Sequence, residues 1–284
     1  MKPIFQDTAL QIKFETSGFV IVNLLNETDL VSLSEIYHQY LGKHVFDHFT
    51  TSNVSLPSEI KYAIANSIDN IVWPKLANLM RDTTFWPGAF LIKPPGEESE
   101  FKAHQDWTFV DEEKFVSGNV WIPLTDVHIH NGCLSVIESS HYPNIKSIRS
   151  QTIPDFFHTN REVIKPFLKP IQLKAGQALI FNHSLIHHSY SNTSGINRIA
   201  VSKGFNSAEA TLIHYLKTSD HTAERYEMPK DFVFGYDNLE DLKHKPINGK
   251  IIKTLSYHDK SYSDDQIIEI LTKRNNIDLI QLFE

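Results

Sequence analysis

Short β-type segments separated by turn residues fill the middle of this chain and restrict its fold more than any other feature. Between Phe85 and Phe205 the chain contains the runs FLIK, SGNVWIPL, GCLSVI, KPIQLKAGQALIFN and NRIAVSKGF, separated by Gly, Pro and Asn. Several short strands joined by such turns are typical of an antiparallel sandwich or barrel. We therefore expect a mainly β core with flanking helices.

Helical patterns lie on both sides of this β region. The stretch NETDLVSLSEIYHQYLG has apolar residues at helical spacing and a cap at Asn26 or Thr28. A second helix is expected to start near Pro57, because proline is favoured in the first turn of a helix. A last helix is expected near the end of the chain, where Ser263 and Gln266 have the spacing of a capping box.

The length and composition favour one enlarged domain over two small ones. At 284 residues and 41% apolar, the chain can bury one large core. We divide this domain into a helical N-terminal part (1–84), a β core (85–205) and a C-terminal part that supplies a lid and a helix (206–284).

Charge and cysteine content exclude several classes of protein. The formal charge of −7 comes without a basic block, which argues against a nucleic-acid partner. Cys133 is the single cysteine, so no intrachain disulfide can form and a reducing compartment is expected. The first residues lack the apolar stretch of a secretory signal, and no later run has membrane-spanning length. We expect a soluble, cytoplasmic protein with no membrane partner.

The segment FKAHQDWTFV, residues 101–110, carries His104 and Asp106 two positions apart. Because the chain has 15 histidines, roughly one His-x-Asp pattern is expected by chance, and the pattern alone is weak evidence. In an extended strand, however, residues i and i+2 project from the same face, so both side chains could reach one cation. A third ligand must then come from another part of the chain.

The stretch LIFNHSLIHHSYSNTSGINRIAVS contains His183, His187 and His188. A helix would place His183 and His187 on one face as a zinc-type pair, but the turn-forming residues and the strand-like flanks favour a strand and a turn. On a strand, His187 and His188 point to opposite sides, so only one of them can be a ligand. Two histidines and one carboxylate with open positions opposite form the facial triad that selects non-haem Fe(II).

Arg198 begins the strand expected after this stretch. The open positions of a facial triad allow a 2-oxo acid to chelate the iron and O2 to take the last position. The distal carboxylate of 2-oxoglutarate then needs a permanently charged partner, and the guanidinium of Arg198 can form two parallel hydrogen bonds where a lysine would offer only a point charge. Ser189, on the same strand face as His187, could add a hydrogen bond.

Other residues have plainer interpretations. His128 and His130 are also two positions apart, but the Asn-Gly pair after them indicates a hairpin turn that sets the register of WIPL against CLSV, so we do not expect them to bind a metal. Trp107 and Phe109 either line a substrate pocket or fill the core. Cys133 lies in an apolar run without a basic neighbour and is expected to be a buried small residue rather than a nucleophile.

Three blocks of sequence follow one another between about Phe90 and Phe205: KPPGEESEFKAHQDWTF, VWIPLTDVHIHNGCLSVIESSH and AGQALIFNHSLIHHSYSNTSGINR. Together and in this order they resemble the phytanoyl-CoA dioxygenase family of Fe(II)/2-oxoglutarate oxygenases. The resemblance implies a double-stranded β-helix, also called a jelly roll, of the cupin-like type. One departure is Ser139, which stands before Ser140 where the family usually has glycine.

The resemblance also implies a ligand set and a reaction. The cofactors would be Fe(II), 2-oxoglutarate as cosubstrate, and O2. Iron would be held by His104, Asp106 and His187, and the 2-oxoglutarate carboxylate by Arg198, with Ser189 nearby and Trp121 beside the cosubstrate. The implied activity is a dioxygenase that hydroxylates an unactivated C–H bond of a small molecule and releases succinate and CO2.

The substrate and two other functional classes stay open. We find no basic cluster for coenzyme A and expect a small polar molecule, such as an amino acid or a secondary-metabolite intermediate, as substrate. A metal hydrolase could use the same three ligands around zinc, but it would need a general base and gives Arg198 no role. A non-catalytic ligand-binding member of the fold would have no use for three converging ligands with open positions.

Overall fold

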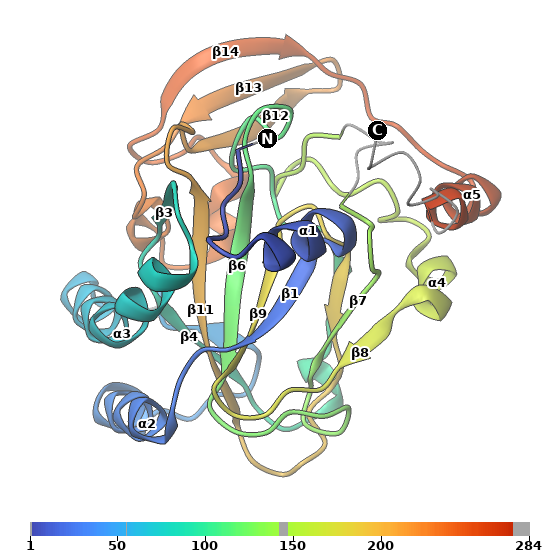
Figure 1. Ribbon diagram of the computed structural model, residues 1–284. Helices are drawn as coiled ribbons and strands as arrows, with labels where there is room; N and C mark the ends of the chain where they lie inside the picture. Colours follow the sequence, from blue (N-terminus) through green and yellow to red (C-terminus); the bar gives the residue numbers. More distant parts are fainter. Residues whose placement is uncertain (1, 55, 142–146, 275–284) are drawn as a thin grey trace.

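Two antiparallel sheets that face each other form the centre of the molecule (Figure 1). The computed structural model describes residues 2–54, 56–141 and 147–274. The larger sheet has seven strands, which are β1 (Phe19–Asn23), β2 (Thr50–Thr51), β3 (Thr83–Phe85), β4 (Ala89–Lys93), β6 (Ser117–Pro123), β9 (Gln177–Asn182) and β11 (Arg198–Ser207). The smaller sheet has four strands, which are β5 (Phe101–His104), β7 (Leu134–Val136), β8 (Lys169–Ile171) and β10 (His187–Ser189). The predicted mainly β jelly roll with flanking helices is confirmed.

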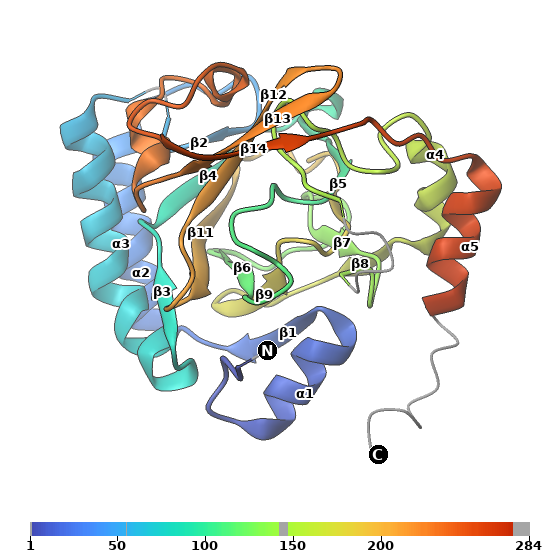
Figure 2. The ribbon, with the colours of Figure 1, turned by 90° about the horizontal axis from the view of Figure 1, so that it is seen from above.

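Helices cover the outer faces of both sheets. They are α1 (Thr8–Ser17), α2 (Glu27–Leu41), α3 (Ser58–Leu79), α4 (Arg161–Ile164) and α5 (Asp264–Arg274). Figure 2 shows α2 and α3 stacked outside the larger sheet, and α4 and α5 on the far side of the smaller sheet. A third sheet of β12 (Ile213–Ser219), β13 (Thr222–Glu227) and β14 (Lys250–Ser256) lies across one end of the roll (Figure 1).

The helices begin where the capping signals predicted. Asn26 caps α2 through a reciprocal pair of hydrogen bonds with Asp29. Ser263 and Gln266 form the same kind of capping box at the start of α5, with hydrogen bonds of 2.9 and 3.3 Å. Pro57 directly precedes α3. The starts of α2 and α5 depend on local hydrogen bonds and that of α3 on the fixed backbone angle of proline, which explains why the sequence predicts them well.

Alternation along the central strands decides which side chains enter the interior of the roll. On β9, Ala178 and Ile180 pack in the core cluster that also contains α2 and α3, whereas Leu179 and Phe181 pack between the two sheets. Trp121 of β6 belongs to the same inter-sheet cluster. The larger sheet is therefore buried on both faces, with helices on one side and the smaller sheet on the other.

Both terminal parts contain more strand than the sequence predicted. β1, from the part expected to be helical, pairs along its whole length with β9, with Phe19 opposite Phe181. The C-terminal part supplies the three-stranded sheet. Neither feature has a local signal, since these strands are stabilised by partners far away in the sequence. We propose on these contacts that the chain is organised as one domain.

The turn at Asn131 and Gly132 does not join two paired strands. Gly132 has a left-handed backbone (φ 78°), and the Asn131 side chain accepts from the His128 amide at 2.8 Å. However, β6 pairs with β9 and β11, whereas β7 pairs with β8 and β10. The prediction that this turn sets the register of WIPL against CLSV is wrong, because the chain here crosses from one sheet of the roll to the other.

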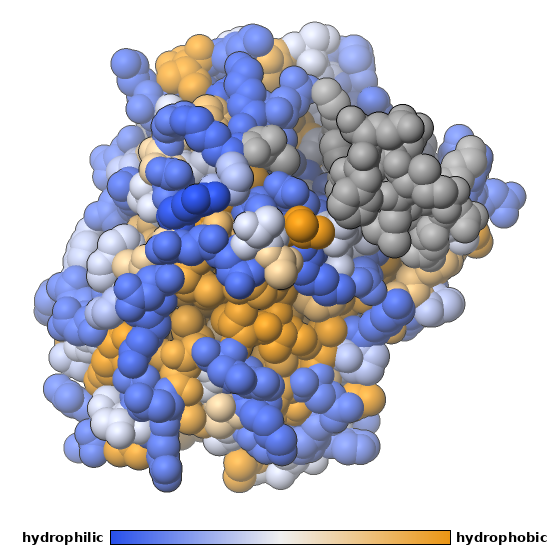
Figure 3. All heavy atoms as spheres, viewed as in Figure 1, coloured by the Kyte–Doolittle hydropathy of each residue, from blue (hydrophilic) through white to orange (hydrophobic). Residues whose placement is uncertain are grey.

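The outer surface carries an apolar area over the edge strand β1 (Figure 3). Ile21 of β1 is 41% exposed there. None of the helices in the described ranges combines the length and the apolar character that crossing a lipid bilayer requires.

Candidate active site

His104, Asp106 and His187 converge inside the roll. The register of β5 against β10 places His187 directly opposite His104, and their ring centroids are 4.1 Å apart. Asp106 follows the end of β5, and its Oδ1 is 3.5 Å from Nε2 of His104 and 3.8 Å from Nε2 of His187. One ligand atom from each residue lies within 4.8 Å of the other two. A single cation between these atoms could bind all three.

Backbone carbonyls orient both imidazoles. Nδ1 of His104 is 2.9 Å from the carbonyl oxygen of Lys102, and Nδ1 of His187 is 3.0 Å from that of Leu185. A carbonyl can only accept, so Nδ1 carries the proton and the lone pair is on Nε2. Each Nε2 faces Asp106, which is the arrangement that metal-ligating histidines require.

Burial sets the protonation of this group. Burial and the neighbouring His104 lower the pKa of His187 to about 4. Burial raises the pKa of Asp106, whereas a proton on the imidazole of His187 or His104 lowers it, and the net result is a pKa below the ordinary value. At neutral pH, His187 is thus neutral and Asp106 is ionised, as metal ligation demands.

The neighbouring histidines have other partners. His188 follows His187 on β10 and has both ring nitrogens engaged: Nδ1 is 3.0 Å from Ser135 Oγ, and Nε2 is 2.8 Å from Glu100 Oε1. The rings of His128 and His130 are 5.9 Å apart, and they join no group of potential metal ligands within the described part of the chain.

Arg198 lies in the same interior beside Trp121. Its guanidinium carbon is 5.2 Å from the Trp121 ring centroid, and the residue is 2% exposed. Its Nε and Nη1 are buried and find no hydrogen-bond partner among the residues that the structure describes, and the same holds for Oδ2 of Asp106. Unpaired buried polar atoms are costly and rare, and these atoms fit an anion beside Arg198 and a cation beside Asp106. Ser189, also buried, lines the same cavity.

Lys93 is a buried neighbour of this site that the sequence analysis did not single out. It lies opposite Arg198 on β4, and its Nζ is 3.2 Å from the carbonyl oxygen of Ser189 and 2.6 Å from that of Tyr190. Burial and the charge of Arg198 lower the pKa of Lys93 to about 7. Its amine therefore links β4 of the larger sheet to β10 of the smaller sheet.

His104, Asp106 and His187, the group that could hold a metal ion, line one cavity of about 820 Å³ together with Arg198. The sequence left open whether Trp107 and Phe109 line a pocket or fill the core. Both residues line this cavity and also pack in the core cluster beneath the third sheet. Trp86, Phe232 and Phe234 also line it. No local pattern pointed to these last three residues, because the packing of distant segments brings them to the cavity.

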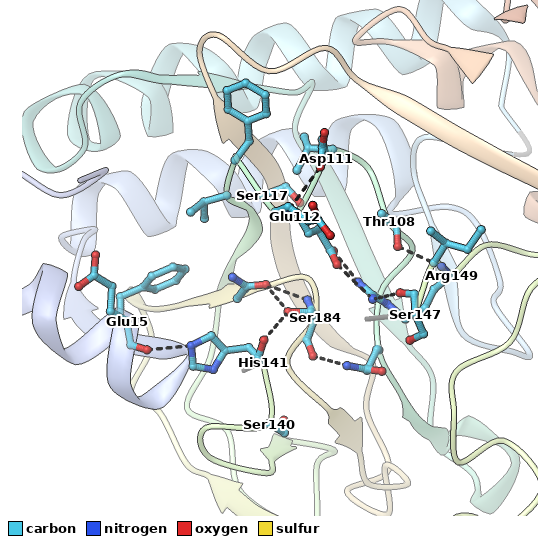
Figure 4. Close-up of a pocket in the computed structure, with 18 of the residues that line it drawn as sticks. Glu15, Thr108, Asp111, Glu112, Ser117, Ser140, His141, Ser147, Arg149 and Ser184 are labelled. Carbon is cyan, nitrogen blue, oxygen red and sulfur yellow. Dashed lines mark hydrogen bonds and ion pairs between the residues drawn. The ribbon is translucent and has the colours of Figure 1, made fainter. Parts of the chain in front are cut away.

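Arg149 holds the segment that carries Asp106. Its Nε donates to the carbonyl oxygen of Asp106 at 2.8 Å, and its two terminal nitrogens bond Glu112 at 3.2 and 2.6 Å. Its backbone amide donates to Thr108 Oγ1 at 3.0 Å. Figure 4 shows Arg149 with Glu112 and Thr108 at the wall of a second cavity, of about 480 Å³. Arg149 is thus a positioning residue for the carboxylate of the group.

Comparison with known sequences identifies relatives of the central part of the chain. The family model described as phytanoyl-CoA dioxygenase (PhyH) matches residues 34–200. Phytanoyl-CoA dioxygenase 1 of Oryza sativa subsp. japonica is 33% identical over 116 residues, which are 40% of this chain and 41% of that protein. Phytanoyl-CoA dioxygenase domain-containing protein 1 of Danio rerio is 30% identical over 138 residues, 44% of this chain and 47% of that protein. The matches thus span less than half the length of these curated relatives.

Solved structures share the fold at low sequence identity. The non-heme alpha ketoglutarate dependent carbocyclase SnoK from nogalamycin biosynthesis superposes with a TM-score of 0.54 and 18% identity, covering 75% of this chain and 90% of that one. HygX from Streptomyces hygroscopicus with iron bound gives a TM-score of 0.53 and 13% identity, covering 72% and 87%. HygX was also solved with nickel, 2-oxoglutarate and hygromycin B, at a TM-score of 0.51 and 15% identity, covering 72% and 88%.

Proposed function

The chain belongs to the phytanoyl-CoA dioxygenase (PhyH) family, and on that premise we propose that it is an Fe(II)- and 2-oxoglutarate-dependent dioxygenase that hydroxylates a small molecule. The observation that carries the proposal is that the His104, Asp106 and His187 group shares one cavity with the unpaired, buried guanidinium of Arg198. Iron, 2-oxoglutarate and O2 together would supply the oxidation of an unactivated C–H bond, with release of succinate and CO2.

The ligand atoms of the group fit Fe(II). Two imidazole nitrogens and one carboxylate oxygen, all on one side of the centre, are the donor set of non-haem iron sites. His104, Asp106 and His187 would hold the metal, and the carbonyls that accept from the two Nδ1 atoms would keep each Nε2 directed at it. Oδ2 of Asp106, buried without a partner in the described residues, is consistent with a cation beside this carboxylate.

Arg198 and its surroundings fit 2-oxoglutarate. The guanidinium would bind the distal carboxylate through two parallel hydrogen bonds. The Trp121 ring packs beside the guanidinium and limits its orientation, and the Ser189 hydroxyl would be a further donor. HygX, a fold relative, was crystallised with 2-oxoglutarate.

A metal hydrolase or a non-catalytic ligand-binding protein would explain fewer features of this site. A hydrolase needs a carboxylate or imidazole free to act as general base. Two carboxylates of the cavity are engaged, since Glu100 bonds His188 at 2.8 Å and Asp155 bonds Arg161 at 3.2 Å. The imidazole of His183 also lines the cavity, but burial lowers its pKa to about 4, which makes it a weak base at neutral pH. A hydrolase or a non-catalytic protein also leaves the buried guanidinium of Arg198 without a purpose.

Anaerobic titration of the Fe(II)-loaded protein with 2-oxoglutarate tests the proposal. Chelation of iron by a 2-oxo acid produces a metal-to-ligand charge-transfer band. We expect this band in the unaltered protein and in His188→Ala, but not in His187→Ala, because only His187 is placed as a ligand. In air, the unaltered protein should convert 2-oxoglutarate to succinate in an Fe(II)-dependent manner. An iron-loaded protein without the band would contradict the proposal.

A further inference from the structure

Trp86 forms a fixed wall of the cavity. Its backbone amide donates to the Gly204 carbonyl at 2.8 Å, and its Nε1 donates to Asn206 Oδ1 at 2.7 Å. Its ring lies so close to Gly204 that a Cβ there would come within 2.2 Å of it. The buried Lys203 also donates to the Trp86 carbonyl at 2.6 Å. Such a wall needs little further ordering when a ligand binds.

Phe109 and His183 complete a cluster of three rings beside the metal-ligand group. The ring centroid of Phe109 is 4.7 Å from that of Trp86 and 4.9 Å from that of His183. Trp86 and His183 are 5.3 Å apart, and His183 is close enough to Asp106 to influence its charge. All three rings line the cavity.

A second aromatic wall comes from the C-terminal part and is anchored to α3. The short helix η3 (Phe232–Gly235) carries Phe232 and Phe234, and Phe232 is 6.2 Å from Phe109. Lys61 of α3 is buried and donates to the carbonyl oxygens of Phe234 and Tyr236, at 3.2 and 2.8 Å. This wall is therefore held by hydrogen bonds from outside the cavity.

The buried charged side chains around these rings offer little to a charged ligand. Arg149 pairs with Glu112, and Arg161 pairs with Oδ2 of Asp155. Oδ1 of Asp155 is buried without a partner among the described residues, but burial raises the pKa of this carboxyl and so disfavours its negative charge. The other cations that line the cavity, apart from Arg198, are two lysines in the described part of the chain, and both are exposed. An anionic substrate group would thus lose its hydration without gaining a buried counter-charge, and a cationic group would have to share Asp155 with Arg161, which is unfavourable.

We propose, as a refinement that rests on the function proposed above, that the substrate is a neutral, mainly apolar molecule built on a planar ring system. Its rings would pack against Trp86, Phe109 and Phe232, since aromatic pairs add stabilisation beyond the burial of equal area. Its hydroxyl or carbonyl substituent would bond Nε2 of His183. Nδ1 of this histidine is 2.9 Å from Ser117 Oγ, and no described residue lies within hydrogen-bonding distance of its Nε2.

The size of the cavity fits such a molecule. Its volume of about 820 Å³ is near the upper end of the roughly 300–1,000 Å³ typical of sites for drug-sized ligands, so space remains beside the cosubstrate. Of the two substrate types expected from the sequence, this favours a ring-bearing metabolite over an amino acid, whose ammonium and carboxylate would need partners that the walls lack.

Binding of 2-naphthol and of decahydro-2-naphthol, measured by isothermal titration calorimetry, tests the ring class. The two probes share a skeleton and a hydroxyl, but only 2-naphthol is planar and aromatic. We expect 2-naphthol to bind about tenfold more tightly, because of its ring–ring contacts. Equal affinities, or no binding of 2-naphthol, would overturn the proposal. Binding of the N,N,N-trimethylanilinium cation as tightly as 2-naphthol would overturn the neutral charge of the substrate.

Variants of the two walls make the test specific. Phe232→Leu should reduce the preference for 2-naphthol several-fold, and Lys61→Met should do the same by loosening the wall without changing its lining. Trp73→Leu, which replaces a tryptophan of α3 that is 45% exposed and does not line the cavity, is the control. His183→Phe should keep the preference for aromatic probes but bind 2-naphthol no better than naphthalene. Unchanged preferences in both wall variants would refute the assignment of the walls.

These titrations distinguish a wrong substrate class from a wrong oxygenase assignment. The titrations are carried out on the full chain with Ni(II) and 2-oxoglutarate, which would fill the metal site without turnover. Selective binding of 2-naphthol in a protein that lacks the charge-transfer band with Fe(II) would refute the oxygenase alone. A normal band without selectivity for 2-naphthol would refute the ring class alone.

Discussion

At the scale of single residues, Arg198 shows how the fold gives a common side chain an unusual environment. It is one of 27 basic residues in the sequence. In the folded chain it is buried beside Trp121 with two N–H groups that have no partner among the described residues. Burial lowers the pKa of Arg198 to about 10, which still leaves it charged at neutral pH. Arg198 is therefore a buried positive charge whose free N–H groups could bind an anion.

Replacing Arg198 should affect the cosubstrate and leave the metal in place. Removing one partner of a buried charge pair costs about 3–5 kcal/mol, so Arg198→Ala should raise the 2-oxoglutarate concentration at half-saturation by roughly a hundredfold or more. Arg198→Lys should recover part of this loss, since lysine keeps the charge but cannot form the two parallel hydrogen bonds of a guanidinium. The midpoint of the charge-transfer titration measures the effect. An unchanged midpoint in Arg198→Ala would remove this residue from the cosubstrate site and reopen the hydrolase alternative.

Ser139 shows how one departure from the family pattern is accommodated. The residue has a left-handed backbone (φ 63°), which explains why glycine is usual at this position. Its hydroxyl donates to the Thr16 carbonyl and its amide to the Ser17 carbonyl, both at 2.8 Å. These two bonds to the end of α1 offset the strain of a side chain in this conformation.

At the scale of elements, the segment after β5 is as important as the strand itself. Asp106 lies beyond the last residue of β5, so strand pairing does not hold it. Instead, Arg149 holds Asp106 by donating to its carbonyl oxygen, and the ion pair with Glu112 holds Arg149 in turn. Arg149 is 3% exposed, whereas the side chain of Glu112 is 29% exposed, so the guanidinium side of this pair is buried.

Loosening this segment should weaken metal binding more than it weakens the fold. Loss of the hydrogen bonds that orient metal ligands typically costs about 10–100-fold in metal affinity, and we expect this range for Arg149→Gln. Titration with Co(II), followed by its visible absorption, reports affinity and ligand geometry together. Glu98→Gln, which removes an exposed carboxylate before β5, is the control. If Arg149→Gln lowered the melting temperature while the Co(II) affinity and spectrum stayed unchanged, its role would be structural.

At the scale of the whole molecule, Lys93 connects the two sheets from within. Its amine donates to two carbonyls of the β10 region, and Arg198 is its neighbour on β11. The buried amine is easier to keep neutral than charged, because two cations lie side by side in a poorly solvated interior. The stability of the roll should therefore depend on the protonation of this residue.

The sign of this dependence follows from the two pKa values. Lys93 titrates at 10.5 when unperturbed and at about 7 in the folded chain. Between these values the unfolded chain binds more protons, so this group makes the free energy of unfolding rise with pH by up to about 1.4 kcal/mol per pH unit. Relative to Lys93→Met, the unaltered protein should gain stability from pH 7 to pH 9 in urea unfolding. A difference that does not change with pH would mean that the buried amine keeps its ordinary pKa.

Local patterns in the sequence were sufficient to predict the elements that interactions between neighbouring residues stabilise. The strand runs between Phe85 and Phe205, the cap at Asn26 and the capping box at Ser263 depend on neighbouring residues, and the structure has them where they were expected. Strand alternation also predicted that His104 and Asp106 could reach one cation. The choice of His187 over His188 came from the resemblance to a known family, since alternation alone left it open.

The tertiary structure decided which of these elements meet. The register that sets His187 opposite His104, the crossing of the chain between sheets at Gly132, and the approach of Phe232 to Phe109 all join segments that are distant in the sequence. Alternation specifies which face a side chain occupies, but it does not specify the strand or loop on the other side of that face. For that reason the sequence could single out His104, Asp106, His187 and Arg198, whereas the bond from Arg149 to Asp106, the buried amine of Lys93 and the aromatic walls became visible only in the fold.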